Sequence, residues 1–193
     1  VCSACHNVIK QTNHQIRTDA DFTARVNNYM AQDKDFESPY EGEAEVCHYL
    51  ELLRDKIGFD KVREAVKNPL TGRKIAAYYG CLLLRPGKVM ALDDPENPRI
   101  MEDFIRALGA EPVIYPFRNE CCGGYVALED AESAAKKSRS VTESAEKGGA
   151  DTIVTACPLC KYNLAKNESP VPVVYFTELL AEALGVKEED DAE

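Results

Sequence analysis

The residues most capable of chemistry in this 193-residue chain are its eight cysteines. A thiolate can act as a nucleophile, form a disulfide or bind a soft metal. Five of the cysteines follow the pattern Cys-x39-Cys-Cys-x34-Cys-x-x-Cys, at Cys81, Cys121, Cys122, Cys157 and Cys160. A second Cys-x-x-Cys stands at Cys2 and Cys5, and Cys47 lies apart from both groups. The spacing indicates one five-thiol site and part of a second site.

Three predicted strands end shortly before the cysteines of the large group. Short apolar runs predict strands over 74–80, 111–116 and 152–156, followed by Cys81, by the Cys121–Cys122 pair and by Cys157. Strands alternating with helices predict a parallel sheet, whose carboxyl ends send their loops to one edge. We therefore expect an α/β, Rossmann-like fold in which the cysteine loops meet at the C-terminal ends of the strands.

Helical patterns fill most of the remaining chain. Helices are predicted over 19–32, 45–57, 97–108 and 129–147, a short helix opens at Pro158, and a strand runs into a helix over 171–184. The acidic residues 187–193 are expected to form a frayed, solvated tail.

Charge and hydropathy exclude several functions. The chain has 33 acidic and 23 basic residues, a net charge of −10, which argues against binding to nucleic acid. The most apolar stretch, 75–84, is shorter than the roughly 20 residues that cross a bilayer, so we expect no direct membrane insertion. No export signal is visible, which predicts a cytoplasmic protein and disfavours a disulfide framework.

Other interpretations of the cysteines compete with a metal cluster. Zinc binds four ligands in its structural sites, so one of the five thiols would be spare. A thioredoxin-like redox pair fits Cys157 and Cys160, which lie between a strand and a helix, but leaves the other three cysteines unexplained. Buried structural cysteines are common, yet their position at three strand ends disfavours this interpretation.

The residues beside the cysteines favour an anionic site. Gly123 and Gly124 lack side-chain bulk, so backbone N–H groups can approach sulfur atoms. Pro158 places Cys157 and Cys160 at a helix N-terminus, where the helix dipole stabilises thiolates.

An internal repeat links the two ends of the chain. Cys2-Ser-Ala-Cys5 is similar to Cys157-Pro-Leu-Cys160, and 46–58 is similar to 173–185. This predicts that 1–66 is the C-terminal remnant of a first repeat and 67–193 a complete second one. Cys2 and Cys5 would then serve a second cluster whose other cysteines are absent. Because the chain begins at Val1 on a metal-type motif, we expect its N-terminus to be artificial or split.

These motifs resemble the CCG (cysteine-rich) domain family, and in particular the C-terminal part of the B subunit of heterodisulfide reductase, over about residues 1–185. The resemblance implies that a noncubane [4Fe-4S] cluster is held by the five-cysteine set, with Cys2 and Cys5 contributing to another cluster. In some relatives the domain is thought to hold zinc instead. The implied site residues are Cys81, Cys121, Cys122, Cys157 and Cys160.

The resemblance also implies an activity and partners. The protein would be part of an oxidoreductase similar to CoB–CoM heterodisulfide reductase, and would reduce a mixed disulfide of thiol cofactors with single electrons. The implied partners are a chain supplying the first CCG half, a ferredoxin-like electron-donor subunit and a flavin-containing subunit. Without the first half the chain would be inactive alone. Two alternatives stay open: a zinc-binding structural module, and an electron-relay component of a related oxidoreductase.

Three further residues are interpreted as structural. Cys47 falls on a predicted helix and aligns with Val174 of the second repeat, so we expect a packed or partly exposed thiol without a ligand role. His6 is expected to be a surface or capping residue rather than a proton donor, and His48 is expected to be structural.

Overall fold

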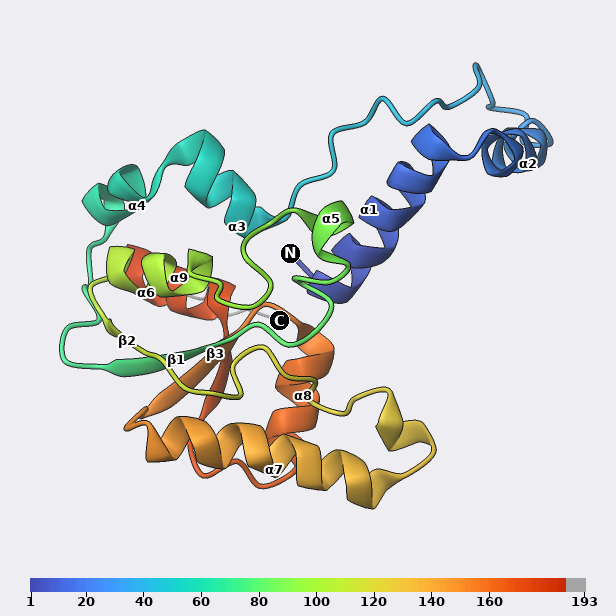
Figure 1. Cartoon of the computed structure of the whole chain (residues 1–193). Coiled ribbons are helices and arrows are strands. Elements are labelled where there is room, and N and C mark those ends of the chain that lie inside the picture. Colours follow the sequence, from blue (N-terminus) through green and yellow to red (C-terminus); the bar gives the residue numbers. More distant parts are fainter. Residues whose placement is uncertain (187–193) are drawn as a thin grey trace, which may run out of the picture.

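Four parallel strands form the centre of the computed structural model, which describes residues 1–186 (Figure 1). The strands lie in the order β2-β1-β3-β4. Their bounds are β1 Lys74–Tyr78, β2 Glu111–Val113, β3 Thr152–Thr155 and β4 Val173–Tyr175. The predicted α/β fold with a parallel sheet is confirmed. The predicted acidic tail, 187–193, lies outside the described residues.

Helices cover both faces of the sheet. On one face lie α6 (Ile100–Ala107) and α9 (Phe176–Leu184), and on the other lie α7 (Ala131–Lys147) and α8 (Pro158–Lys166) (Figure 1). Two short elements lie in the connections, α5 (Gly87–Met90) and the 3-10 turn η2 (Val126–Leu128).

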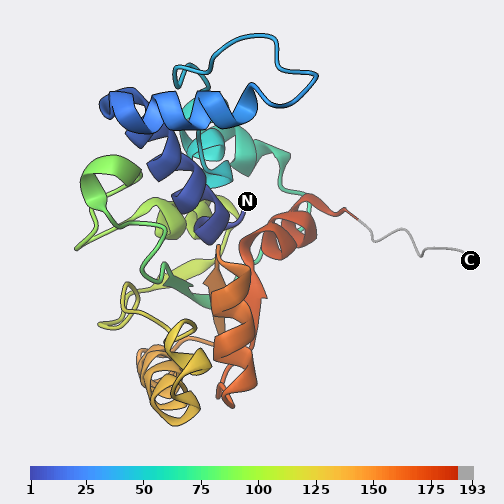
Figure 2. The same cartoon turned by 90° about the vertical axis from the view of Figure 1, so that its right-hand side faces the viewer.

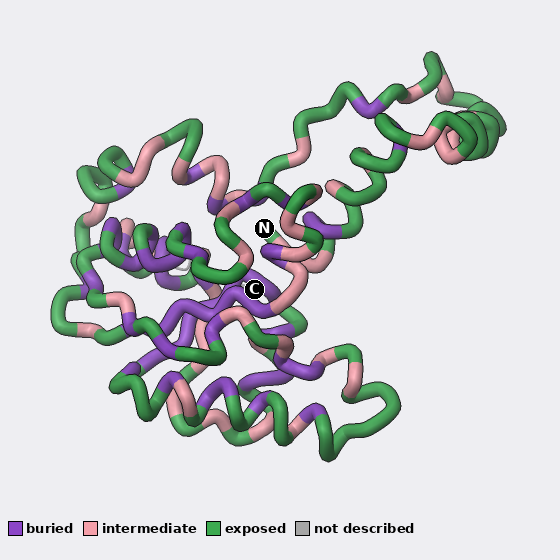
Figure 3. Tube along the Cα trace, viewed as in Figure 1, coloured by how far each residue is buried: buried purple, intermediate pink, exposed green. Residues whose placement is uncertain are grey.

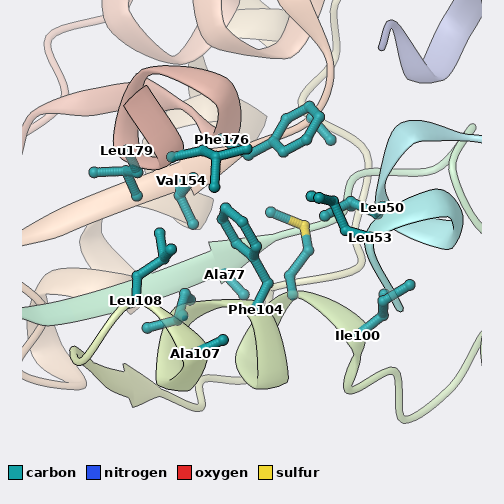
Figure 4. Close-up of a cluster of buried hydrophobic side chains, with 14 of the residues drawn as sticks. Leu50, Leu53, Ala77, Ile100, Phe104, Ala107, Leu108, Val154, Phe176 and Leu179 are labelled. Carbon is teal, nitrogen blue, oxygen red and sulfur yellow. The ribbon is translucent and has the colours of Figure 1, made fainter. Parts of the chain in front are cut away.

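The first core lies between the sheet and the α6 and α9 helices (Figure 4). Phe104 and Phe176 meet there with a centroid distance of 6.0 Å. Leu50 and Leu53 join the same core from α3 (Tyr49–Glu51) and the π-helical turn η1 (Leu52–Ile57), which leads into α4 (Phe59–Ala65). Residues around 49–65 therefore pack against the four-stranded sheet. The sequence-based division at residue 66 assigns these residues to the first repeat instead.

The second core lies on the α7 and α8 face and contains part of the cysteine set. Because side chains alternate along a strand, Ala77 of β1 faces the first core and Tyr78 faces the second. The second core also includes Cys122, Cys157 and Cys160. These thiols are thus fixed by close packing before any metal is considered.

An N-terminal arm, made of α1 (Ser3–Thr18) and α2 (Ala20–Met30), extends away from the sheet (Figure 1). Asp19 caps α2, since its carboxylate accepts a hydrogen bond from the Phe22 N–H at 2.9 Å. The outer part of the arm is largely exposed (Figure 3), and α2 buries no residue. Within residues 1–186, no helix is both long and apolar enough to cross a membrane.

Two differences from the sequence-based expectations concern the first 66 residues, which the sequence predicts to be the remnant of a first repeat. The helix α1 was not predicted, because it is mostly polar and buries only Ser3, His6, Asn7 and Ile16. The helix expected over 45–57 begins later, at Tyr49, so the prediction of a helical Cys47 is wrong. His48 ends the preceding extended segment: its Nδ1 accepts from the Leu50 N–H at 3.2 Å, and its own N–H donates to the Glu51 carboxylate at 2.6 Å.

Candidate metal centre

Five cysteine side chains from three segments of the chain line one cavity at the carboxyl end of the sheet. They are Cys81, Cys121, Cys122, Cys157 and Cys160. The Sγ atoms of Cys81 and Cys121 are 3.8 Å apart, and those of Cys122 and Cys160 are 3.5 Å apart. The structure therefore brings the whole predicted set together, while the role of these thiols as ligands stays a prediction.

The remaining thiol, Cys157, is the N-cap of α8. A hydrogen bond from the Cys160 thiol lowers the pKa of Cys157, and backbone N–H groups of Cys160, Leu159 and Ala4 lower it further, against the effect of burial. The Ala4 contribution comes from α1, so the N-terminal arm helps to lower the pKa of Cys157.

In the Cys121–Cys122 pair, which precedes the two glycines, the pKa of Cys121 is also lowered. Hydrogen bonds from Cys122 and Cys81 lower the pKa of Cys121, and the Gly123 N–H, 3.4 Å from its Sγ, adds to this. The hydrogen bond to Cys121 raises the pKa of Cys81, with burial as the second cause. The predicted approach of a backbone N–H to sulfur is therefore present at Gly123.

Glycines form part of the wall of the cavity. A Cβ at Gly80 would lie 3.2 Å from the Sγ of Cys160, and one at Gly124 would lie 3.5 Å from the Sγ of Cys122. Gly123 has a φ of +83°, and its Cβ would lie 3.0 Å from the Ala134 Cα. Side chains at these positions would crowd the sulfur atoms or the loop that carries them.

A buried ion pair anchors the loop before the cysteine pair. A guanidinium N–H of Arg118 donates to the Glu102 carboxylate at 2.7 Å, and both side chains are buried, with exposures of 7% and 1%. The hydroxyl of Tyr79 also donates to Glu102, and the Tyr79 backbone N–H donates to the Arg118 carbonyl at 2.8 Å. Tyr79 itself lines the cysteine cavity. No sequence pattern indicated this network.

Two further side chains hold the same loop from the second core. The Tyr78 hydroxyl donates to the Glu120 carbonyl at 2.7 Å, and the Asn163 amide donates to the Cys122 carbonyl at 2.6 Å. These bonds attach the loop to β1 and to α8 on either side of the thiols. The signal that points to Asn163 is its position three residues after Cys160, on the face of α8 that carries that thiol.

The other predicted ligands, Cys2 and Cys5, lie at the start of α1, beside the cavity rather than in its lining. The Sγ of Cys2 accepts from the Cys5 N–H at 3.3 Å. The intervening Ser3 lines the cavity and donates both its N–H and its hydroxyl to the Ala156 carbonyl. The starts of α1 and α8 therefore meet, as Figure 2 shows.

Two histidines lie under α1, and the expectation of a surface position for His6 is wrong. His6 is 6% exposed, because α1 packs this face against α3, and burial lowers its pKa. His48 is fully buried beside it, with a ring centroid distance of 5.4 Å. The structural role predicted for His48 is confirmed by its capping of α3.

The donor set fits an iron–sulfur cluster. Its thiols are soft ligands, and there are five of them around one cavity, one more than a tetrahedral zinc ion uses. Within the described part of the chain, no group of three His, Cys, Asp or Glu side chains is arranged to hold a metal ion, so the fit rests on the kind and number of the thiols that line the cavity. The lowered pKa values of Cys121 and Cys157 favour the thiolate form that a cluster requires.

Comparison with known proteins gives similar chains in two kinds of reductase. The 8-methylmenaquinol:fumarate reductase membrane anchor subunit of Wolinella succinogenes is 31% identical over 96% of this chain. The B subunit of the ferredoxin:CoB-CoM heterodisulfide reductase of Methanosarcina mazei is 30% identical over 96%, and the heterodisulfide reductase B-subunit-like protein of Archaeoglobus profundus is 29% identical over 95%. This chain spans 64 to 66% of the length of these relatives.

The family assignment rests on the segment that contains the five thiols. Residues 75–165 match the model of the cysteine-rich domain, CCG, and this range runs from β1 to α8. Together with the similarity to the B subunits of heterodisulfide reductases, the match confirms the predicted resemblance. Residues 75–165 of this chain therefore belong to the CCG cysteine-rich domain family.

Proposed function

We propose that this protein is a component similar to the B subunit of heterodisulfide reductase and reduces a disulfide of two thiol compounds at a noncubane [4Fe-4S] cluster. The observation that carries the proposal is the convergence of five thiols from three strand ends on one cavity. The reaction converts R–S–S–R′, two electrons and two protons into two thiols. The electrons come from a ferredoxin-like donor subunit. A flavin-containing subunit would pass electrons to that donor.

The proposed ligands are the five cysteines of the cavity, with Cys2 and Cys5 contributing to a neighbouring cluster. When bound, such a cluster supplies electrons one at a time and an iron atom to which sulfur can bind. The protein holds Cys121 and Cys157 ready as thiolates. Tyr125 and Leu159 line the cavity and are 58% and 37% exposed, so they mark the side on which a disulfide would enter.

The chain is proposed to contain parts of two repeats, divided near residue 66. The repeat equivalence is supported by the helix that follows each Cys-x-x-Cys: His48 and Tyr175 are both N-caps, and their backbone N–H groups donate to Glu51 and Glu178, respectively. If disulfide cleavage requires the clusters of both repeats, the 193-residue chain alone is inactive and needs a first CCG half.

The test is metal and sulfide analysis of protein purified without oxygen, together with Cys→Ser variants. Iron and acid-labile sulfide are expected in the parent protein, with an electron paramagnetic resonance spectrum that changes when a thiol is added. Serine at any of the five cavity cysteines should lower the iron content. Cys47→Ser is the matched control, because Cys47 is an exposed free thiol outside the cavity, and it should keep the iron.

Stoichiometric zinc without iron in anaerobic protein would contradict the proposal and favour the zinc-binding structural module. Equal iron content in the Cys47→Ser and Cys121→Ser proteins would contradict the assignment of the ligands but not the presence of iron. The two results separate the identity of the metal from the identity of its ligands.

The similarity to a fumarate reductase component favours a second candidate function. That relative is 31% identical, as similar as the heterodisulfide reductase relatives, so this chain could be an electron-relay component of a related oxidoreductase. Reduction of a model disulfide by the complete complex, with electrons from reduced ferredoxin, distinguishes the two. A complex that oxidises its donor but leaves disulfides intact would be an electron relay.

A further inference from the structure

One cysteine lines two hollows of the protein. Cys121 belongs to the cavity that contains the five thiols, and it also lines a second pocket of about 330 Å³, between α7 and the loop 117–121. We call this second hollow the outer pocket. Among the described residues, no other residue lines both hollows. Cys121 is half-buried, whereas Cys122, Cys157 and Cys160 are buried. A small molecule in the outer pocket can therefore reach Cys121 without entering the cysteine cavity.

The outer pocket carries more positive than negative charge. The helix α7 contributes the exposed Lys136 and Lys137, and the loop contributes Glu120 as the acidic residue of the lining. The ion pairs of the described residues involve other lysines, namely Lys10, Lys56, Lys147 and Lys161. Two ammonium groups and one carboxylate give the pocket a positive charge, in a chain whose net charge is −10. The pocket therefore favours a small ligand that carries carboxylate groups.

The position of these charges suits an exchange reaction between Cys121 and a disulfide. Lys137 lies close enough to attract a negative charge on Cys121. Phe117, which is 42% exposed, adds an apolar surface to the same lining. A disulfide whose carboxylates contact the two lysines therefore has its sulfur atoms within the same pocket as Cys121.

Cys81 is placed to complete such an exchange. Its Sγ lies 3.8 Å from the Cys121 Sγ and lines the cysteine cavity but not the outer pocket. Cys122 is closer in sequence, but the Cα atoms of consecutive residues are about 3.8 Å apart, less than the roughly 4.4 to 6.8 Å that disulfides span. Cys81 is therefore the expected disulfide partner of Cys121.

We propose that Cys121 of the metal-free protein is a modification site for disulfides of small thiols that carry carboxylates, and that Cys81 resolves the mixed disulfide. In the first step the Cys121 thiolate attacks R–S–S–R, which forms Cys121–S–S–R and releases RS⁻. In the second step the Cys81 sulfur gives its proton to solvent and attacks the Cys121 sulfur, which forms the Cys81–Cys121 disulfide and releases a second RS⁻ into the outer pocket. The two protein thiols are oxidised by two electrons, and R–S–S–R is reduced to two thiols.

This modification would protect two of the proposed cluster ligands. A disulfide is reversed by thiols, whereas oxidation of a cysteine to a sulfonic acid is irreversible. A sulfur atom in the disulfide is not a thiolate and cannot bind a metal as one, so the disulfide and a metal centre exclude each other. The inference goes beyond the proposed function, because it concerns the protein before a metal is bound and does not depend on which metal that is.

The experiment follows thiol–disulfide exchange in the full chain. The protein is freed of metal with a chelator under anaerobic, reducing conditions, the reductant is removed, and glutathione disulfide is added as the anionic probe. Peptide mapping by mass spectrometry should find a Cys81–Cys121 disulfide in the parent protein and glutathione on Cys121 in the Cys81→Ser protein. Cys47, an exposed thiol outside the cavity, is the internal reference and should keep glutathione as a mixed disulfide. An unmodified Cys121 in the parent, or its pairing with a cysteine other than Cys81, would overturn the proposal.

The charge of the probe tests the outer pocket. In about 0.15 M salt, where distant charges are screened, Cys121 should react about tenfold faster with glutathione disulfide than with cystamine, a cationic disulfide, when both rates are divided by those of Cys47. The Lys136→Ala/Lys137→Ala protein should lose this preference, because alanine keeps α7 helical but removes both ammonium groups. Lys61→Ala, at an exposed position of α4, is the control and should keep it. The same preference in both variants would contradict the role of the pocket.

Iron analysis of the protein before chelation separates this inference from the proposed function. A protein that contains zinc but forms the Cys81–Cys121 disulfide once metal-free supports the modification and rejects the iron–sulfur cluster. A protein that contains iron and sulfide but forms no such disulfide when metal-free does the reverse.

Discussion

The Ser3 hydroxyl donates a hydrogen bond to the Ala156 carbonyl across 2.7 Å, and the Ser3 N–H donates to the same oxygen across 3.0 Å. Ser3 follows Cys2 and Ala156 precedes Cys157, so the contact joins the two Cys-x-x-Cys motifs directly. The Tyr175 hydroxyl completes this junction, since it lies 2.8 Å from the Ala156 carbonyl and 2.7 Å from the Val1 carbonyl. The distance between the two motifs is therefore fixed by hydrogen bonds to the backbone.

Replacing Tyr175 with phenylalanine tests the junction. The Tyr175→Phe protein loses the hydroxyl hydrogen that the Val1 and Ala156 carbonyls share, and we expect its free energy of unfolding to fall by about 1 to 2 kcal/mol in denaturant titrations. Tyr29→Phe is the control, because Tyr29 is 74% exposed, and it should not change the stability. Equal stability of the two variants would show that the bridge contributes nothing.

Two glycines with the same backbone conformation separate steric crowding from backbone strain. Gly123 and Gly149 have φ values of +83° and +86°, but a Cβ at Gly123 would lie 3.0 Å from the Ala134 Cα, while one at Gly149 would meet no atom within 4 Å. Both alanine variants should lose about 1 kcal/mol from the positive φ. Gly123→Ala should also move the cysteine loop and lower iron affinity about tenfold or more, measured by chelator competition. Iron loss in Gly149→Ala alone would contradict this assignment.

The buried ion pair between Glu102 and Arg118 should be sensitive to removal of one partner. Burial raises the pKa of Glu102, while its hydrogen bonds to Tyr79 and Arg118 oppose that effect. Arg118→Met leaves the carboxylate without its cation, so we expect a loss of about 3 to 5 kcal/mol in the free energy of unfolding. Arg106→Met, which breaks a half-exposed pair with Asp103, should change stability by less than about 1 kcal/mol.

A double variant distinguishes charge burial from packing. Adding Glu102→Gln to Arg118→Met removes the unpaired charge, so part of the lost stability should return. If the double variant is as unstable as the sum of the single variants, lost packing rather than the buried charge causes the effect.

The convergence of the five thiols could be predicted from the sequence because it follows from topology. In a parallel sheet, the residues that follow each strand lie at the same edge of the sheet. Once the strands were identified, Cys81, Cys121 and Cys157 could therefore be expected to lie close together. The glycines and Pro158 could likewise be interpreted locally, because their effects act within a few residues.

The supporting contacts could not be predicted in this way. Glu102 and Arg118 belong to a helix and a loop, and their pairing depends on how α6 packs on the sheet. The buried face of the helix α1 is mostly polar, because it contacts backbone carbonyls and His48 instead of a hydrophobic core. The predicted repeat relates α1 to α8, but the similarity covers only a few residues. It therefore does not show from the sequence which side chains of α1 are buried.

The buried His48 should make stability depend on pH. Burial lowers the pKa of His48 from 6.5 to about 3, and repulsion from His6 adds to this. In the unfolded chain His48 binds a proton near pH 6.5, whereas in the folded chain it binds this proton only near pH 3. The contribution of neutral His48 to stability is therefore fully present above pH 6.5 and decreases as the pH falls below that value. At pH 5.5 the expected loss from this residue is about 1.4 kcal/mol relative to pH 7.5.

The measurement compares the free energy of unfolding of the parent protein and of His48→Asn between pH 7.5 and 5.5. Asparagine can still cap α3 through its side-chain oxygen, so the helix start is retained while the titrating group is removed. The carboxylates titrate in both proteins, and their effects cancel in the difference. The difference therefore reports the His48 imidazole together with its repulsion of His6. The parent should lose more stability than the variant over this range. Parallel pH profiles would show that the His48 imidazole gains a proton in the folded protein as readily as in the unfolded chain.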